Sequence, residues 1–375
     1  MRIAILTLTT TNRVTGVAEY LINLLENLQQ IDHVNEYYIF TSLDNRYMFK
    51  LNNKNFHEIV VKLRHDPWIV QRPLYHIWQR MYLPRWCSRN KIDILHLPNT
   101  LFVPSNMNVV VTVHDIADIK TKKYSFLRTK IRKKMIYSII NEASSIITVS
   151  ESTANDIRAL GGTNVTTIYN GFIHHGSQYN NGEEILERYG LKKKSYFLFI
   201  GTFLKHKNID RLIYAYKEFL KTNDTIDLVL MGAPDNASKE IAKMILKEEL
   251  GEKIKLMNYV DKNTKEVILK NASLFCMLSS YEGFGFPVLE SQSLGTPVLT
   301  SNVSSLPEVA GYGAVTVDPH NIQEISKHMI QILNDKELQK KIIQNGYVNI
   351  KRFSWNQCAV ETLKMYQTVF LKLKN

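Results

Sequence analysis

The 375-residue chain has little cysteine, no long apolar run and fewer acidic than basic side chains. Its three cysteines, Cys87, Cys276 and Cys358, are far apart and odd in number, which gives neither a disulfide framework nor a zinc site. No stretch approaches the roughly 18 apolar residues of a membrane-spanning helix, and the apolar run at residues 3–8 is too short for a signal peptide. We therefore expect a cytoplasmic protein that does not cross a membrane.

The composition is that of a folded protein. Hydrophobic residues make up 45% and charged residues 22% of the chain, which excludes a disordered, collagen-like or coiled-coil protein. The length is too great for one core and suits two domains. The net charge is +12, and residues 1–170 hold 21 Lys and Arg against 13 Asp and Glu. An anionic partner is expected on that half, and charge alone does not choose among phospholipid, nucleic acid and a polyanionic acceptor.

Short apolar runs alternate with helical patterns along nearly the whole chain. Continuous apolar runs are typical of parallel strands that helices cover on both faces. The expected strands are residues 3–8, 37–41, 92–96, 109–113, 145–149, 165–168, 196–200, 228–231, 254–257, 272–277 and 297–300. The expected helices are residues 16–28, 74–87, 127–141, 209–220, 237–249, 264–270, 287–294, 322–333, 337–351 and 355–373. A polar Gly- and Asn-rich passage at residues 169–182 predicts a linker. The sequence thus predicts an α/β protein of two doubly wound domains.

Ligands of open α/β sheets bind beyond the carboxyl ends of the strands, and one such loop, residues 279–290, is unusually dense in candidate groups. Its glycines, Gly283 and Gly285, allow a tight turn, and Pro287 suits the start of a helix. Backbone N–H groups at that helix start favour phosphate or sugar oxygens. Glu282 and Glu290 lie before and inside the helix. Each glutamate taken singly could equally be a capping charge.

The string YEGFGFPVLE, in which seven residues separate Glu282 from Glu290, resembles the paired-glutamate motif of retaining glycosyltransferases of family 4. Residues 295–298 and 304–309 also resemble that family, in particular its bacterial mannosyltransferases of O-antigen and capsule assembly. The resemblance implies the GT-B fold, in which two Rossmann-like domains face an interdomain cleft that holds the active site.

Residues 201–208, after an expected strand, resemble the donor-phosphate loop of the family. Lys207 would be the cation on the diphosphate. Family members usually carry an arginine just before this lysine or just after the glycine, where this chain has His206 and Thr202. The departure puts donor affinity in question more than fold.

The resemblance also implies a role for each candidate site residue. Glu290 would bind the nucleotide ribose, Glu282 the donor sugar, and the amides of residues 283–286 the sugar hydroxyls. The implied catalytic residues are His114, Glu282 and Lys207. The implied donor-binding residues are Gly16, Thr202, Lys207, Gly283, Phe284, Gly285, Phe286, Pro287, Val288 and Glu290. The implied acceptor-side residues are Asp115 and Ser150.

In the first half the assignments compete with ordinary structural roles. Gly16 follows the first strand where the family has a glycine-rich loop, but a tight βα turn explains it as well, and no G-x-G-x-x-G fingerprint is present. His114 would contact the donor sugar, and Asp115 would fix the imidazole or reach the acceptor; a satisfied loop pair is the alternative. Ser150, like Ser152, could be only a helix cap.

The resemblance further implies that the C-terminal helix, about residues 355–375, crosses back onto the first domain. The domains would then be residues 1–170 with that helix, on the acceptor side, and residues 171–354, which bind the nucleotide sugar. No D-x-D sequence occurs, so no metal ion and no cofactor are expected, the donor being a substrate.

Residues 120–135 form a basic segment, in which Phe126, Leu127, Ile131 and Met135 could share one helical face. This pattern predicts docking on an anionic membrane surface, at the inner face of the plasma membrane. A solvated helix with its apolar stripe packed on the sheet is the alternative. The same two interpretations, docking on a membrane and packing in the core, apply to Trp68–Val70 and Arg72–Trp86.

The leading hypothesis is a retaining, metal-independent hexosyltransferase that moves a hexose from a nucleotide-diphosphate sugar to a lipid-linked or growing surface glycan. GDP-mannose is the preferred donor on resemblance, with UDP-glucose and UDP-N-acetylglucosamine open. The alternatives are a soluble synthase or phosphorylase of the same fold and a catalytically silent, membrane-bound partner of another transferase. Nucleic acid is not expected as a partner, because the basic run lacks the interleaved aromatics of RNA-binding segments.

Overall fold

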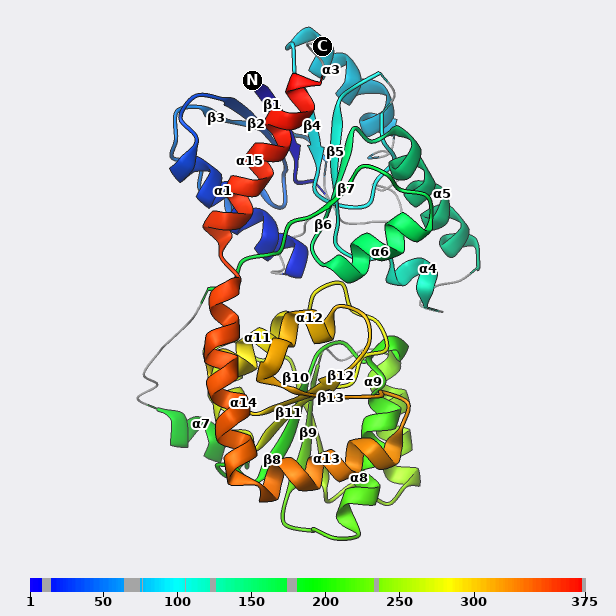
Figure 1. Cartoon of the computed structure of the whole chain (residues 1–375), viewed down its shortest axis with the longest axis vertical. Helices are drawn as coiled ribbons and strands as arrows, with labels where there is room; N and C mark the ends of the chain where they lie inside the picture. Colours follow the sequence, from blue (N-terminus) through cyan, green and yellow to red (C-terminus); the bar gives the residue numbers. More distant parts are fainter. Residues whose placement is uncertain are drawn as a thin grey trace. The chain divides into compact units, whose positions relative to one another are not determined.

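The computed structural model describes residues 1–8, 15–63, 75, 77–104, 106–121, 126–173, 181–232 and 236–372. The chain forms two compact units (Figure 1). Unit 1 contains Met1–Ile119, Tyr124–Gly171 and Phe353–Asn375, and unit 2 contains Lys120–Lys123 and Phe172–Arg352.

Unit 1 is built on a seven-stranded parallel sheet in the order β3-β2-β1-β4-β5-β6-β7. Its strands are β1 (Arg2–Leu6), β2 (Glu36–Ser42), β3 (Phe56–Val61), β4 (Ile94–Leu97), β5 (Val109–Val113), β6 (Ser145–Thr148) and β7 (Val165–Thr167). Its helices are α1 (Gly16–Ile31), η1 (Arg46–Met48), the π-helix η2 (Trp78–Tyr82), α3 (Leu83–Arg89), α4 (Ala117–Lys120), α5 (Phe126–Glu142), α6 (Glu151–Ala159) and α15 (Trp355–Leu371).

Unit 2 repeats this plan with a six-stranded parallel sheet in the order β10-β9-β8-β11-β12-β13. Its strands are β8 (Tyr196–Ile200), β9 (Asp227–Gly232), β10 (Ile254–Asn258), β11 (Leu274–Met277), β12 (Val298–Ser301) and β13 (Val315–Val317). Its helices are α7 (Gly182–Arg188), η3 (Lys205–Lys207), α8 (Ile209–Leu220), α9 (Asn236–Lys247), α10 (Lys262–Asn271), α11 (Phe286–Ser293), α12 (Leu306–Ala310), η4 (Gly311–Gly313), α13 (Ile322–Asn334), α14 (Lys336–Asn349) and η5 (Ile350–Arg352).

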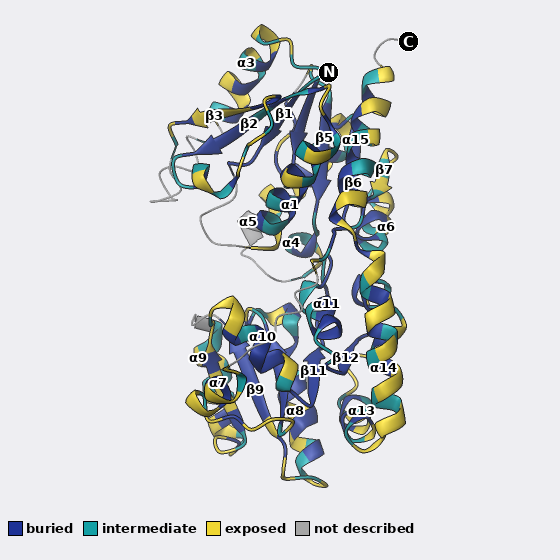
Figure 2. Ribbon diagram, turned by 90° about the vertical axis from the view of Figure 1, so that its left-hand side faces the viewer, coloured by how far each residue is buried: buried dark blue, intermediate teal, exposed yellow. Residues whose placement is uncertain are grey.

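Strand β8 shows why these apolar runs form central parallel strands. Successive side chains of a strand point to opposite faces of the sheet. Phe197 and Phe199 pack into one core with α8 and α13, whereas Tyr196, Leu198 and Ile200 pack into a second core with α10 and α11. Both faces of the sheet are therefore buried, and Figure 2 shows the strands in the buried class with exposed residues on the outer helix faces. In both units the strand order and the helix-covered parallel sheets confirm the predicted Rossmann-like α/β class.

The sequence pattern missed two edge strands. β3 carries the exposed His57 and Glu58 in the middle of its six residues, so it lacks the continuous apolar run that marked the other strands. β13 has only three residues. An edge strand is covered by fewer neighbours and tolerates polar residues. The pattern therefore finds the middle of each sheet better than its edges.

The last helix, α15, packs against α1 and β4 in unit 1 (Figure 1). Its first residue, Trp355, lies against Gly171, where a Cβ atom would come within 2.2 Å of the Trp355 backbone nitrogen. Trp355 also approaches Tyr20 of α1, with the ring centroids 6.2 Å apart. Gly171 is thus required for the close approach of the chain to the start of α15.

A buried histidine connects α15 to the sheet. His96 of β4 is fully buried, its Nδ1 lies 2.6 Å from the Tyr366 hydroxyl of α15, and its Nε2 lies 2.8 Å from Thr112 Oγ1 of β5. Burial lowers the pKa of His96 from 6.5 to about 3. The imidazole is therefore neutral in the folded protein at physiological pH.

We expect unit 1 to lose stability in mild acid because of His96. Between pH 6.5 and 3 the unfolded chain binds a proton that folded His96 does not, so stability falls as the pH falls through this window. At pH 5 the loss is about 2 kcal/mol relative to pH 7. The four tryptophans (Trp68, Trp78, Trp86 and Trp355) all fall within the residue ranges of unit 1, so urea unfolding followed by tryptophan fluorescence reports on this unit. A His96→Gln variant should show a smaller pH dependence, and an unchanged pH dependence would contradict the assignment.

Candidate active site

The two glycines of the loop between β11 and α11 predicted a tight turn, and the structure has this turn at Gly285. This residue has φ +120°, and a Cβ atom there would lie 2.9 Å from Leu306 Cδ2. It precedes α11, which begins at Phe286, one residue earlier than predicted. A side chain at Gly285 is disfavoured both by the backbone and by the neighbouring leucine.

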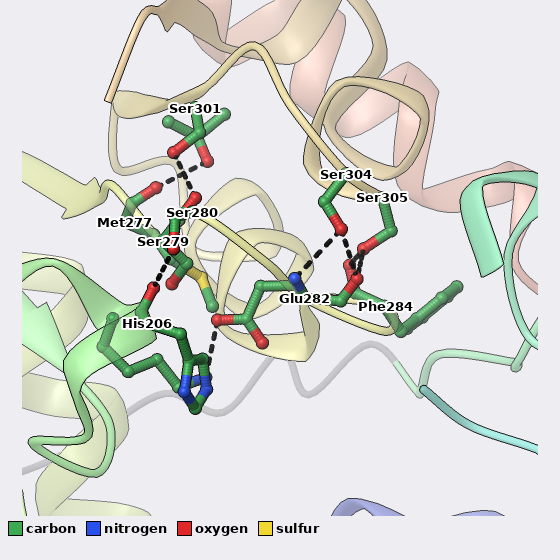
Figure 3. A network of polar contacts seen from close by, with 11 residues as sticks. His206, Met277, Ser279, Ser280, Glu282, Phe284, Ser301, Ser304 and Ser305 are labelled. Atoms are coloured by element: carbon green, nitrogen blue, oxygen red, sulfur yellow. Dashed lines mark hydrogen bonds and ion pairs between the residues drawn. The ribbon is translucent and has the colours of Figure 1, made fainter. Parts of the chain in front are cut away.

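Two serines of the next loop hold the backbone around Glu282. The Glu282 N–H donates to Ser304 Oγ at 3.0 Å, and the Ser304 hydroxyl lies 2.7 Å from the Glu282 carbonyl oxygen. The Ser305 hydroxyl lies 2.9 Å from the same oxygen and 2.8 Å from the Phe284 carbonyl oxygen (Figure 3). The position of Glu282 is therefore set by side chains some 20 residues further along the chain.

A second contact ties this loop to the one that carries Lys207. The Ser280 N–H donates to the His206 carbonyl oxygen at 2.8 Å, and the Ser280 hydroxyl lies 3.2 Å from it (Figure 3). As a result Lys207 Nζ lies 2.5 Å from Glu282 Oε1, and the two side chains are only 15% and 12% exposed. Two residues 75 positions apart that the sequence assigned to one donor site thus form a largely buried ion pair.

Glu290 has a partner of its own. Its Oε1 lies 2.7 Å from Nζ of Lys265 in α10, with the side chains 13% and 23% exposed for Lys265 and Glu290. Its second oxygen, Oε2, is buried, and within the described part of the chain it has no hydrogen-bond partner. Lys265 was missed from the sequence, because its only signal is the contact with Glu290, which depends on the packing of α10 against α11.

The other predicted donor residues differ in their burial and contacts. Thr202 is exposed. Phe284 and Phe286 pack edge to face with ring centroids 5.1 Å apart. Val288 is fully buried, and its N–H donates to the Gly285 carbonyl oxygen, so it supports the turn. Gly283 and Pro287 are half-buried on the same loop and helix start.

In unit 1, His114 follows β5 and has a defined tautomer. Its Nε2 lies 3.1 Å from the Pro98 carbonyl oxygen. Burial lowers the pKa of His114 below 6.5, so the ring is neutral at physiological pH. A carbonyl oxygen only accepts, so Nε2 carries the proton and Nδ1 is the acceptor nitrogen. The ring also meets the Tyr20 ring edge to face at 4.9 Å.

The remaining predicted residues of unit 1 have local contacts. Asp115 Oδ1 accepts from the Ala117 N–H at 2.9 Å at the start of α4, and the imidazole of His114 is held by the Pro98 carbonyl. Ser150 is fully buried and caps α6 by accepting from the Thr153 N–H, which is the helix-cap role that the sequence allowed. Gly16 is the exposed first residue of α1, and residues 9–14 before it lie outside the described residues.

The basic segment 120–135 is only partly described, since residues 122–125 and the side chains of 126–128, including Phe126 and Leu127, lie outside the described residues. Of the other two apolar residues expected on one face, Met135 is buried in the core and Ile131 is 44% exposed. Arg132 pairs with Asp118 at 2.9 Å. Within the described ranges no helix is both long and apolar enough to span a membrane. Docking on a membrane stays a prediction, and binding to phosphatidylglycerol vesicles is the measurement that tests it.

Two family models match the chain in tandem. Residues 14–174 match Glycosyltransferase Family 4, and residues 181–349 match Glycosyl transferases group 1. Between them they account for most of the chain, one in each half. The chain belongs to the family 4 glycosyltransferases. This confirms the resemblance found in the loop with Glu282 and Glu290.

Relatives and solved structures agree with this assignment. The chain is 28% identical over 374 residues to O-antigen chain mannosyltransferase B of Escherichia coli, covering 94% of this chain and 96% of that protein. Its fold matches sucrose-phosphate synthase from Thermosynechococcus elongatus with a TM-score of 0.79, 17% identity and 99% coverage of both chains. It also matches Anabaena HepE in complex with UDP-glucose with a TM-score of 0.75 and 14% identity, covering 98% of this glycosyltransferase and all of HepE. Each unit thus has the Rossmann-like fold of GT-B glycosyltransferases.

Proposed function

We propose that this protein is a retaining hexosyltransferase that moves mannose from GDP-mannose to a lipid-linked or growing surface glycan. The observation that carries the proposal is the largely buried Lys207–Glu282 pair. It places a cation and a carboxylate together, beyond the carboxyl ends of β8 and β11, where ligands of such sheets bind. A cation that is shielded from water interacts strongly with a phosphate group.

The proposed chemistry is a same-face substitution at the anomeric carbon. The bond between C1 and the diphosphate oxygen breaks, and a bond from C1 to the acceptor oxygen forms on the same face. The acceptor proton passes to the leaving diphosphate. The configuration at C1 is retained because the acceptor bonds to the face from which the diphosphate departs. Lys207 stabilises the negative charge that develops on the departing phosphate, as do N–H groups at the start of α11.

The remaining side chains orient the donor. Glu282 accepts from hydroxyls of the transferred sugar, and Glu290 accepts from hydroxyls of the ribose. Neutral His114 offers Nδ1 as an acceptor for a further sugar hydroxyl, because Nε2–H is already donated to Pro98. Asp115 lies next to it on the acceptor side. Metal independence is part of the proposal, and it predicts that turnover persists in excess EDTA.

Support for the substrates comes from the relatives. The relative that matches along nearly the whole chain is named for mannosyl transfer to the O-antigen chain, which favours mannose and a surface glycan. HepE was solved with UDP-glucose, which supports a nucleotide-sugar donor and keeps uridine donors among those to be tested.

A thermal-shift screen tests the proposal. The protein is heated with GDP, UDP, ADP and their sugars at millimolar concentration, and a ligand that binds only the folded state raises Tm by mass action. We expect GDP and GDP-mannose to stabilise the protein selectively. Selective stabilisation by UDP or its sugars would overturn the choice of base. Stabilisation by none would overturn the transferase proposal and favour the catalytically silent partner. The missing arginine, whose two usual positions hold His206 and Thr202, also suggests this alternative.

A further inference from the structure

A chain of buried polar side chains runs from α15 to the ring next to His114. The Tyr366 hydroxyl lies 2.6 Å from His96 Nδ1, His96 Nε2 lies 2.8 Å from Thr112 Oγ1, and Thr112 Oγ1 lies 3.1 Å from the Tyr20 hydroxyl. The ring of Tyr20 then meets the imidazole of His114 edge to face. These hydrogen-bonded side chains join four elements, α15, β4, β5 and α1.

Two members of this polar series lie on the strands that lead into His114 and into Pro98. His96 of β4 is two residues before Pro98, whose carbonyl accepts from His114, and Thr112 of β5 is two residues before His114 itself. The polar series is thus attached to the ends of the two strands that carry the imidazole and the carbonyl that holds it.

Tyr20, His96, Thr112 and Tyr366, the four members of this hydrogen-bonded series, are each at most 1% exposed, so water cannot replace a lost partner. Neutral His96 has one donor and one acceptor nitrogen. The hydrogen bonds of the series can therefore all run in one direction only, either from Tyr366 toward Tyr20 or from Tyr20 toward Tyr366. Loss of either the Tyr366 or the Thr112 hydroxyl leaves a buried nitrogen unsatisfied, which favours displacement of the neighbouring side chains.

We propose that Tyr366 is a positioning residue for His114, acting through His96, Thr112 and Tyr20. The hydrogen-bonded series fixes the ring of Tyr20, and this ring limits the His114 imidazole to one orientation. His114 Nδ1 is thereby directed at the donor sugar. The proposal rests on the proposed function, in which His114 contacts that sugar. It gives the C-terminal helix a role in the reaction besides packing.

Three variants test the chain with little change of volume. Tyr366→Phe removes one hydroxyl, Thr112→Val replaces the central hydroxyl by a methyl group, and Thr112→Ser keeps it. Tyr196→Phe is the matched control, because the buried Tyr196 hydroxyl donates to the Ile268 carbonyl oxygen at 2.6 Å in unit 2, away from the chain. We expect Tyr366→Phe and Thr112→Val to lower kcat about tenfold with little change in KM for the donor. Thr112→Ser should restore kcat.

A second readout needs no turnover. The His114 imidazole N–H, donated to the Pro98 carbonyl, should give a protected proton resonance in the free protein, identified by its absence in His114→Asn. We expect this resonance to broaden or exchange faster in Tyr366→Phe and Thr112→Val and to be unchanged in Tyr196→Phe.

The outcomes separate the two proposals. An active enzyme in which Tyr366→Phe and Thr112→Val match the control in kcat and in the His114 resonance would overturn the positioning role. Absence of transfer from every nucleotide sugar would instead overturn the proposed function. The resonance alone would then decide whether the chain orients His114.

Discussion

Replacing Lys207 with methionine is expected to lower kcat about 10³-fold and to abolish stabilisation by nucleoside diphosphates. The reason is that Lys207 is the cation proposed for the leaving phosphate, and a preorganised charge that is shielded from water contributes most where charge develops. Methionine keeps much of the volume of the side chain and removes its charge. Steady-state kinetics with the donor identified by the thermal-shift screen, together with the Tm shift on adding the diphosphate, measure both effects.

This variant also leaves Glu282 largely buried without its partner, which destabilises a protein by about 3–5 kcal/mol. A loss of activity could therefore be a loss of folded protein. The double variant Lys207→Glu with Glu282→Lys keeps an ion pair and should regain stability but not activity, because the charge at the phosphate position is reversed. Lys217→Ala, which breaks a more exposed pair with Glu248 at 2.7 Å, is the control for losing a lysine. Full activity of Lys207→Met would refute the assignment of Lys207.

Most of the fold could be predicted from the sequence because the central strands are buried on both faces. β5, for example, is an unbroken apolar run with one threonine, and its predicted bounds, residues 109–113, are those of the structure. The pattern failed where burial is one-sided or short. β3 and β13 lie at sheet edges, and α6, α7 and α12 are helices of nine residues or fewer.

The candidate site could be predicted only where a motif is contiguous. The residues from Glu282 to Glu290 form one contiguous motif, and the helix in it begins within one residue of its predicted start. Lys265, 25 residues before Glu290, becomes a partner only through the packing of α10 on α11, and Tyr366 lies 270 residues from His96. Such long-range partners carry no local pattern.

The second large effect is expected for Glu290→Gln, which should weaken binding of GDP itself about 100-fold. A carboxylate that accepts from ribose hydroxyls contributes about 1.5–3 kcal/mol, as hydrogen bonds to charged groups do. The amide also leaves Lys265 largely buried without its counter-charge, which disturbs the orientation of the side chain at position 290. Isothermal titration with GDP measures the change in Kd, because GDP carries the ribose and diphosphate without the sugar.

Glu282→Gln supplies the contrast that makes this result specific. The transferred sugar is the only part of the donor that Glu282 is proposed to contact, so this variant should bind GDP within a few-fold of the native protein and lose affinity mainly for GDP-mannose. Glu248→Gln, which weakens the pair with Lys217 elsewhere in unit 2, controls for the loss of one carboxylate from a lysine pair. If Glu290→Gln bound GDP normally and failed only with the sugar nucleotide, the ribose assignment would be wrong, and Glu290 would belong with Glu282 among the residues that contact the sugar.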